Sequence, residues 1–420
     1  MKLKGLKDID LKEKRVIFRV AYDVPLKEKG KHMIVTDDSR ILASLPTLRY
    51  LLRKKCKVII LTWLGRPGGK RVEKLTLDPV SKRLSELLKK SVKKLDACVG
   101  PGVDLALSKM KPGDVVMLEN VRFEKDEEEG NNALTKKLSK MADVVVFDAF
   151  AQSHRTAPST TGILSAVPSV AGLNMEEEIS KLSKLLEKPK APFVVILGGA
   201  KMSDKIETLI NLLHVADVVL IGGAMAHNFL KAQGMKIAGS LVEDASHESK
   251  KVRKKIYQIA EDILAKTKDT YVNLGSGLNM PKIVLPRDLI SAHDTQSPSQ
   301  TCTIELSDVH HHIPWNWMYL DIGPKTVALY SKIIERAKTI FWNGPLGYFE
   351  ESAFSHGTKG IAVAITKSKA LSVLGGGDTE SMIKKFKLQR KFDYISTGGG
   401  AVLEFLSGKP LPVIKYLLKN

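Results

Sequence analysis

The residues best suited to chemistry follow short apolar runs in the second half of the chain. Four times such a run leads into paired glycines and a helix-like segment: VVILGGAKMSDKIE (194–207), DVVLIGGAMAHNFL (217–230), LSVLGGGDT (371–379) and DYISTGGGAVLEFL (393–406). Glycines at a helix start leave backbone N–H groups open at the positive end of the helix dipole, where anions bind. One unit alone is a weak signal. Four together predict a parallel sheet whose strand ends converge on a polyphosphate.

Two lysines and an aspartate occupy these glycine loops. Lys201 and Lys205 follow the first glycine pair at a predicted helix start, where ammonium groups can balance the oxygens of a transferring phosphoryl group. A solvated helix start is the alternative interpretation. Asp378 stands beside the predicted phosphates, which calls for a divalent cation between the two negative groups, although the residue could also cap the helix.

Arginines follow the apolar runs of the first half. They are Arg19 before AYDVPL, Arg40 after two aspartates, Arg66 in TWLGRPGG, Arg122 in MLENVRF and Arg155 in FDAFAQSHR. The guanidinium group is a planar fork of donors that suits phosphate and carboxylate oxygens. Any one of these arginines could form a surface ion pair. Together, at the carboxyl edge of one sheet, they predict a site for a small, multiply charged anion.

Other site classes lack support in the sequence. Neither GxxxxGK[ST] nor GxGxxG occurs, which argues against a Walker loop and a dinucleotide fold. His310, His311 and His312 have no acidic or cysteine partners at ligand spacing, so a loop is favoured over a metal site. Three widely separated cysteines match neither a disulfide framework nor a zinc pattern.

Chain length and net charge limit the number of domains and the kinds of partner to be expected. A chain of 420 residues predicts two domains, and the absence of a long apolar run or signal peptide predicts a cytoplasmic protein without a membrane span. The net charge of +20 could reflect binding of nucleic acid, binding of a phosphorylated metabolite, or only a lysine-rich surface. The excess is spread through amphipathic stretches such as 81–95, which favours the surface interpretation and makes a nucleic-acid partner unlikely.

Hydrophobic periodicity predicts an α/β fold. In the first half, valine-rich strands alternate with amphipathic helices; the strands are expected at 15–20, 57–61, 114–118 and 143–147, and the helices at 44–55, 81–95 and 134–141. A further helix is expected over 174–188, ended by Pro189. A second array of strands and helices begins at Phe193, so this helix is predicted to be a stiff connector.

Taken together, the strings closely resemble the phosphoglycerate kinase family over nearly the whole chain. The resemblance rests on eleven motifs in family order: RVAYDVPL, TDDSR, LGRP, LENVRF, DAFAQSHR, LGGAKMSDK, GGAMA, LDIGPKT, WNGPLGYFE, LGGGDT and STGGGA. It implies two doubly wound, parallel-sheet (Rossmann-like) domains joined by a helical hinge. The expected bounds are 1–173 with 407–420 for the acidic substrate, 174–189 for the hinge and 190–406 for the nucleotide.

The resemblance also implies an activity. A monomeric hinge-bending kinase would pass a phosphoryl group between the carboxylate of 3-phosphoglycerate and ADP or ATP, with Mg²⁺. A carboxylate nucleophile is already deprotonated, so the chemistry needs alignment and charge neutralisation and no general base.

By the same resemblance, residues of this chain take family roles. Arg40, Lys201, Gly376 and Gly399 would act on the transferring phosphoryl group. The substrate acid would be held by Ala21, Asp23, Arg40, Trp63, Arg66, Arg122 and Arg155. The nucleotide would be held by Gly199, Lys205, Gly223, Tyr319, Asn343, Glu350, Gly376, Gly377, Asp378 and Thr379, with Asp378 also binding the metal ion.

Four positions depart from the family pattern. Ala21 and Asp23 stand where the family has aspartate and asparagine, Trp63 replaces a histidine, and Tyr319 replaces a glycine of the adenine pocket, where it could stack on the base or block it. Two alternatives to the kinase therefore stay open. One is a diverged relative that acts on a related phosphorylated acid, and the other is a catalytically silent nucleotide- or nucleic-acid-binding protein.

Overall fold

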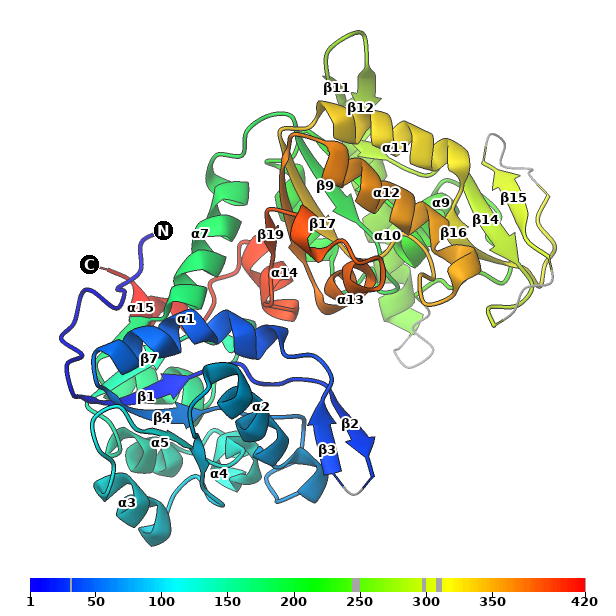
Figure 1. Cartoon of the computed structure of the whole chain (residues 1–420). Helices are drawn as coiled ribbons and strands as arrows, with labels where there is room; N and C mark the ends of the chain where they lie inside the picture. Colours follow the sequence, from blue (N-terminus) through cyan, green and yellow to red (C-terminus); the bar gives the residue numbers. More distant parts are fainter. Residues whose placement is uncertain (31, 244–249, 297–299, 307–311, 420) are drawn as a thin grey trace. The chain divides into compact units, whose positions relative to one another are not determined.

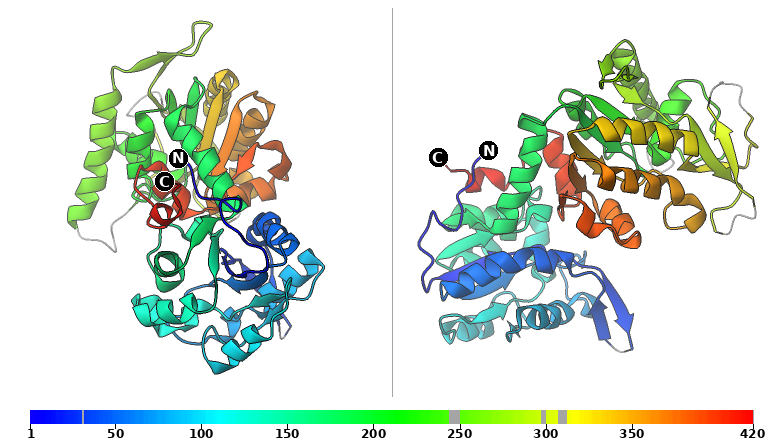
Figure 2. Two further views of the ribbon diagram at one scale, coloured as in Figure 1. Left: turned by 90° about the vertical axis from the view of Figure 1, so that its left-hand side faces the viewer. Right: turned by 45° about the horizontal axis from the view of Figure 1, so that its top comes forward.

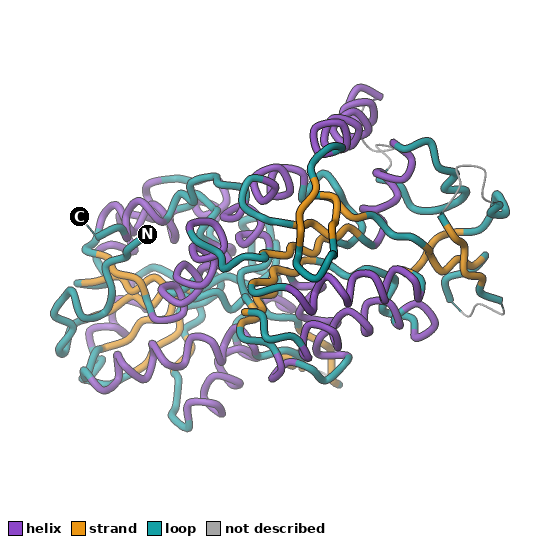
Figure 3. Tube along the Cα trace, turned by 90° about the horizontal axis from the view of Figure 1, so that it is seen from above, coloured by secondary structure: helices purple, strands orange, loops and turns teal. Residues whose placement is uncertain are grey.

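The computed structural model describes residues 1–30, 32–243, 250–296, 300–306 and 312–419 (Figure 1). The chain forms two compact units. Unit 1 is Met1–Ser180 with Pro410–Asn420, and unit 2 is Lys181–Lys409. Each unit contains its own six-stranded sheet, and Figure 3 shows helices on both sides of the strands in each unit.

The sheet of unit 1 is parallel throughout, in the order β5-β6-β4-β1-β7-β8. Its strands are β1 (Arg15–Arg19), β4 (Lys57–Leu61), β5 (Lys93–Lys94), β6 (Val115–Met117), β7 (Val144–Phe147) and β8 (Ser169–Ala171). The central strands are almost continuously apolar because helices cover both faces. From β1 the chain builds outward through β4 and then returns to add β7 on the other side, so the topological switch point lies between β1 and β7.

In the described residues up to 172, unit 1 also contains six α-helices and a hairpin. The helices are α1 (Ser39–Arg53), α2 (Asp78–Leu88), α3 (Pro101–Ser108), α4 (Lys125–Glu129), α5 (Asn132–Ser139) and α6 (Ile163–Ala166), and the hairpin pairs β2 (Leu26–Lys29) with β3 (His32–Val35). Helix α1 buries Ile41, Leu45 and Leu48 on one stripe, in one cluster with Phe18 and Ile60 of the sheet.

The sheet of unit 2 is also parallel, in the order β13-β10-β9-β17-β18-β19. Its strands are β9 (Phe193–Leu197), β10 (Val218–Ile221), β13 (Ile283–Val284), β17 (Thr339–Asn343), β18 (Leu371–Gly375) and β19 (Tyr394–Ile395). The chain runs from β9 outward through β10 and later places β17 on the other side of β9. The switch point of this sheet therefore lies between β9 and β17.

Helices and two small antiparallel sheets complete unit 2. The helices are α8 (Ile206–Leu213), α9 (Gly223–Ala232), α10 (Lys250–Thr267), α11 (Pro324–Arg336), α12 (His356–Lys367), α13 (Gly377–Lys385) and α14 (Gly400–Leu406). The small sheets contain β11 (Tyr271–Asn273) with β12 (Asn279–Pro281), and β14 (Asp288–Ala292) between β15 (Cys302–Glu305) and β16 (Met318–Ile322). Helices α11 and α12 share one buried cluster with β9 and β17.

Helix α7 (Leu173–Glu187) contains the boundary between the units. The chain end then rejoins unit 1 through α15 (Ile414–Leu417). Leu3 pairs with Leu418 in a β-bridge, so the two ends of the chain lie side by side (Figure 2). These elements confirm the predicted fold class: two parallel, doubly wound sheets joined by a helix.

Some sequence expectations need correction. The helix expected over 81–95 ends at Leu88, because Lys89 adopts a left-handed conformation with φ of 54°, and Lys93–Lys94 form edge strand β5. Asp378 is not a helix N-cap, because Gly376 occupies that position of α13. Cys56 and Cys98 are buried free thiols and Cys302 is an exposed one. In the part of the chain that the structure describes, no helix is both long and apolar enough to cross a bilayer.

Candidate active site

Glycine loops of unit 2 interlock at the switch point of its sheet. The amide of Gly198 donates to the carbonyl of Asn343 at 2.9 Å, and that of Gly199 donates to the carbonyl of Pro345 at 2.7 Å. The amide of Gly223, at the start of α9, donates to Leu346 at 3.1 Å. Three of the loops that follow strands are thereby fixed against one another, where open α/β sheets bind ligands.

Close backbone packing explains the glycines at this edge. A Cβ on Gly223 would lie 2.7 Å from the amide nitrogen of Gly199, and Gly223 has a φ of +60°. Gly376 has a φ of +98°, and a Cβ there would lie 2.6 Å from Nδ2 of Asn343. A side chain at either position would meet both backbone strain and a steric clash. The loops therefore present bare backbone where a phosphate could approach.

The loops after β17 and β18 are joined by the side chains of two predicted nucleotide-binding residues, Asn343 and Thr379. Nδ2 of Asn343 donates to the carbonyl of Gly375 at 2.8 Å, and the amide of Gly344 donates to Oγ1 of Thr379 at 2.8 Å. Asn343 and Thr379 are both buried. Gly377 and Asp378 lie exposed in the first turn of α13, so the backbone and the carboxylate of this turn are open to a ligand.

The two predicted lysines occupy different environments. Lys205 directly precedes α8, and a Cβ on Gly199 would lie 3.3 Å from its Nζ, so the ammonium group lies over the glycine loop. Burial lowers the pKa of Lys205, and neighbouring carboxylates, including that of Asp378, oppose this shift. Lys201 is exposed in the loop before the helix and does not lie at the helix start.

The remaining predicted nucleotide residues of unit 2 are more widely spread. Glu350 has an exposed side chain, and its carbonyl accepts a hydrogen bond from Nζ of Lys385 in α13 at 2.6 Å. Gly399 is the N-cap of α14, with a φ of 55°. Tyr319 is 3% exposed, and its ring centroid lies 5.8 Å from that of His227. The Tyr319 ring is therefore part of the core and has almost no exposed face on which a base could stack.

Unit 1 gathers several predicted residues at the carboxyl edge of its own sheet. Nη1 of Arg40 donates to the carbonyl of Asp23 at 2.6 Å, and Oδ1 of Asp23 accepts from the amide of Gly65 at 2.9 Å. Nη1 of Arg122 donates to the carbonyl of Gly65 at 2.7 Å. The loops after β1, β4 and β6 are thus connected through Asp23 and Gly65, with two arginines bound to them.

Trp63 lies between two guanidinium groups. Cζ of Arg122 is 4.1 Å from the ring centroid of Trp63, and Cζ of Arg19 is 4.5 Å from it. Burial lowers the pKa of Arg122, and the neighbouring charge of Arg155 lowers it further, while Glu128, 3.3 Å from Nε of Arg122, opposes the shift. Trp63 is only 3% exposed, so its ring packs against Arg122 and offers almost no surface for direct contact with a ligand.

Arg19 differs from the other arginines of the first half. Its side chain is fully buried, Nε donates to the carbonyl of Ser159 at 2.9 Å and Nη1 to the carbonyl of Val20 at 2.5 Å. Burial lowers the pKa of Arg19 to about 9. Arg19 therefore belongs to the framework under Trp63 and not to an anion-binding surface. Sequence position alone grouped it wrongly with the others.

The other predicted residues of unit 1 flank this cluster. Arg66 and Arg155 are exposed, and the structure records no hydrogen bond or ion pair from either side chain to a described residue. Ala21 is half-buried in the loop after β1. Together with Arg122, Arg66 and Arg155 provide three guanidinium groups on segments that follow β6, β4 and β7 of the same sheet.

Asn120 was missed as a site residue. Its Nδ2 donates to the carbonyls of Leu64 and Leu75, at 2.7 and 3.0 Å, and its Oδ1 accepts from the amides of Leu64 and Arg122. This buried amide fixes the loop that contains Arg66 and the turn that contains Arg122. The signal was its place in the string LENVRF, two residues before Arg122.

The structure describes only part of the histidine tract. His310 and His311 lie outside the described residues, and His312 is exposed. Within the described ranges, no group of three or more His, Cys, Asp or Glu side chains is arranged to hold a metal ion. Any cation bound through Asp378 would therefore take further ligands from phosphate oxygens or water, as Mg²⁺ commonly does.

The sequence of this chain matches a known protein family. Residues 6–409 match the family profile described as Phosphoglycerate kinase. A phosphoglycerate kinase of Thermosipho africanus is 46% identical over 412 residues, which cover 97% of this chain and 96% of that protein. One from Pseudothermotoga lettingae is 44% identical, and the match covers 99% of both chains.

Solved structures agree with the sequence matches. Phosphoglycerate kinase from Coxiella burnetii superposes with a TM-score of 0.81 at 37% identity, covering 99% of this chain and 98% of that one. The enzyme from Pyrococcus horikoshii superposes with a TM-score of 0.83 at 33% identity, with the same coverage of both chains. With its two parallel sheets, interlocked glycine loops and ordered motifs, this chain belongs to the phosphoglycerate kinase family.

Proposed function

We propose that this protein transfers a phosphoryl group reversibly between 1,3-bisphosphoglycerate and ADP, giving 3-phosphoglycerate and ATP. The observation that carries the proposal is the set of interlocked glycine loops around Gly199, Gly223 and Gly376, with Lys205 over one of them, in a chain of this family. Residues 190–406 would hold the nucleotide, 1–173 with 407–420 the acid, and 174–189 would be the hinge.

The acid would bind to the arginine cluster of unit 1. Arg66, Arg122 and Arg155 would hold the substrate phosphate, because guanidinium groups match phosphate oxygens in charge and geometry. Asp23 and Ala21 would face the rest of the acid, with Trp63 supporting Arg122. Oδ1 of Asp23 already accepts from the amide of Gly65, so the carboxylate has one oxygen left to accept from a ligand hydroxyl.

The nucleotide would bind to unit 2. Its phosphates would lie on the exposed first turn of α13 and on the loop that Lys205 covers. Asn343 and Thr379 would keep the loops after β17 and β18 together. Glu350 would bind the ribose, and Tyr319 would shape the base site. The exposed carboxylate of Asp378 would hold Mg²⁺ near the phosphates. When bound, the ion would neutralise phosphate charge.

The chain's own residues would supply charge and alignment. In the direction of ATP use, a carboxylate oxygen of 3-phosphoglycerate forms a bond to the γ-phosphorus, and the bond from that phosphorus to the β–γ bridging oxygen breaks. Arg40 and Lys201 would balance the charge on the transferring oxygens, while the open backbone at Gly376 and Gly399 would donate hydrogen bonds. The carboxylate is ionised at neutral pH, so no residue needs to take up a proton.

Turnover by purified protein tests the proposal. With Mg-ATP, we expect saturable phosphorylation of 3-phosphoglycerate and weaker or no turnover of other phosphorylated hydroxy-acids. Turnover of another acid alone would support a diverged relative instead. Nucleotide binding without turnover of any acid in the panel would support a silent binding protein. Sedimentation equilibrium would test the prediction that the protein is a monomer.

A further inference from the structure

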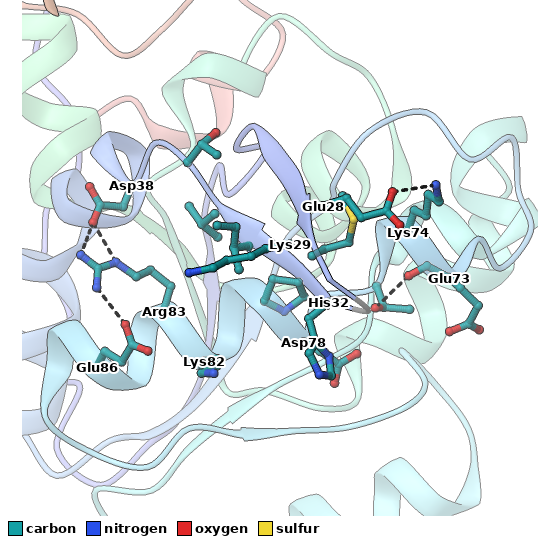
Figure 4. Close-up of a pocket in the computed structure, with 16 residues that line it drawn as sticks. Glu28, Lys29, His32, Asp38, Glu73, Lys74, Asp78, Lys82, Arg83 and Glu86 are labelled. Atoms are coloured by element: carbon teal, nitrogen blue, oxygen red, sulfur yellow. Dashed lines mark hydrogen bonds and ion pairs between the residues drawn. The ribbon is translucent and has the colours of Figure 1, made fainter.

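A groove in unit 1 is lined by Asp38, two residues before Arg40, among other charged residues. It has a volume of about 1070 Å³ and lies between the hairpin of β2 and β3 and helix α2 (Figure 4). Charged side chains of both signs line it. At one end of the groove, Arg83 of α2 meets Asp38, the residue that directly precedes α1.

The Arg83–Asp38 pair has a constrained geometry. Nε and Nη2 of Arg83 both donate to Oδ2 of Asp38, at 2.9 and 2.7 Å. Nη1 of the same guanidinium group donates to Oε2 of Glu86 at 2.8 Å. The side chains of Arg83 and Asp38 are 38% and 26% exposed. All three guanidinium nitrogens are therefore engaged, which fixes the plane of the group against the start of α1.

The pair changes how α1 begins. Asp38 is the N-cap residue of α1, yet its side chain makes no capping hydrogen bond. Its carboxylate is engaged by Arg83 instead, and Oδ1 of Asp37 accepts the amide and hydroxyl of Ser39, at 2.9 and 2.6 Å. A capping aspartate normally stabilises its own helix. Here Asp38 connects the first turn of α1 to α2.

Arg40 is the second residue of that first turn. Its side chain is held at the other end, because Nη1 donates to the carbonyl of Asp23 at 2.6 Å. The guanidinium group of Arg40 is thus positioned by two anchors: Asp23 at its tip, and Asp38 with Arg83 at its base. Both anchors lie within unit 1.

We propose that Arg83 is a positioning residue for Arg40, acting through Asp38. The inference rests on the proposed function, in which Arg40 neutralises charge on the transferring phosphoryl group. Partly exposed ion pairs contribute little to stability. Loss of Arg83 is therefore expected to lower kcat while the unfolding temperature changes little, because a small misplacement of a group that acts in the transition state is costly.

Arg83→Met tests the proposal, with Lys82→Met as the matched control on the same helix. Lys82 is exposed and also lines the groove. We expect Arg83→Met to lower kcat about tenfold, with the KM values for acid and nucleotide within threefold of wild type. Lys82→Met should stay within twofold, and Asp38→Asn should reproduce the effect of Arg83→Met in an independent variant.

A double-mutant cycle separates positioning of Arg40 from a general structural role. In an Arg40→Lys background, Arg83→Met should have little further effect on kcat, because the group that it positions has already been replaced. A tenfold loss in both backgrounds, or an Arg83→Met enzyme equal to Lys82→Met, would overturn the inference. If wild type itself does not phosphorylate 3-phosphoglycerate, the proposed function has failed instead.

Discussion

The stack of Arg19, Trp63 and Arg122 leads to a quantitative prediction about acid binding. Trp63→Leu removes the aromatic face that lies 4.1 Å from Arg122 and 4.5 Å from Arg19. A desolvated contact of this type contributes about 2 kcal/mol. Without it, the Arg122 guanidinium group samples more orientations and must be ordered again whenever the acid binds, which costs about 0.5–1.5 kcal/mol.

The expected effect is selective for the acid. An ordering cost of about 0.5–1.5 kcal/mol corresponds to a rise of about 2- to 13-fold in the KM for 3-phosphoglycerate. The KM for ATP should change less than twofold, since the proposed nucleotide residues belong to unit 2. Trp63→Phe, which keeps a ring between the two guanidinium groups, should raise the acid KM less than threefold.

Initial rates over a range of acid concentrations measure this effect. Trp63 is nearly fully buried, so Trp63→Leu is also expected to lower the free energy of unfolding, by less than the about 3–5 kcal/mol of a truncation to alanine. The assay temperature must therefore lie well below the unfolding transition recorded by circular dichroism. Trp315→Leu provides the control, because Trp315 is 85% exposed. An unchanged acid KM in folded Trp63→Leu would refute the reasoning, as would equal effects of leucine and phenylalanine.

Four further predictions concern other parts of the two units. Lys201→Met should remove most of kcat and leave the Kd for nucleotide within threefold. Equal losses in rate and affinity would contradict the proposed role of Lys201 in balancing charge on the transferring phosphoryl group. Asp378→Asn should raise the Mg²⁺ concentration for half-maximal rate about tenfold, and an unchanged Mg²⁺ titration would reject Asp378 as the ligand. Gly376→Ala adds a Cβ 2.6 Å from Nδ2 of Asn343 at a φ of +98°, so the KM for ATP should rise and the free energy of unfolding should fall by about 1–3 kcal/mol, as checked by kinetics and urea titration. Asp148, the buried residue directly after β7, has its pKa raised by burial from the ordinary 3.8 to about 7. The folded state therefore binds the carboxyl proton more tightly than the unfolded state, and stability is lost as the pH rises from about 4 to about 7. Asp148→Asn should therefore gain up to about 4 kcal/mol over wild type between pH 4 and pH 8 in urea unfolding, and a pH-independent difference would count against the raised pKa.

The strand ends could be predicted from the sequence because their signals are local. An apolar run followed by glycines identifies the end of a strand, and β9, β10 and β18 end where the strings indicate. The hydrogen bond from Gly199 to Pro345 could not be predicted in this way. It joins residues far apart in the chain and depends on which strands become neighbours.

Local sequence patterns also could not predict which charged side chains are buried. Arg19 follows a strand in the same way as Arg122, yet its guanidinium group points into the protein toward the carbonyl of Ser159, 140 positions later in the sequence. Helix α2 gives a similar case. Its apolar periodicity continues past Leu88, but pairing of Lys93 with Val116 supplies hydrogen bonds that a longer helix would lose.

The arginines proposed to bind the acid fall into two physical classes. Arg122 is already ordered by Trp63 and by the carbonyl of Gly65, and its side chain is 15% exposed. Arg66 and Arg155 are exposed and have no hydrogen-bonding partner for their side chains in the described ranges, so they must be immobilised when a ligand binds, at about 0.5–1.5 kcal/mol each. A phosphate should therefore be captured first by the preorganised Arg122 and enclosed afterwards by the other two. Arg122→Lys replaces an already ordered, planar set of donors with a single point charge. It should therefore weaken acid binding more than Arg66→Lys or Arg155→Lys.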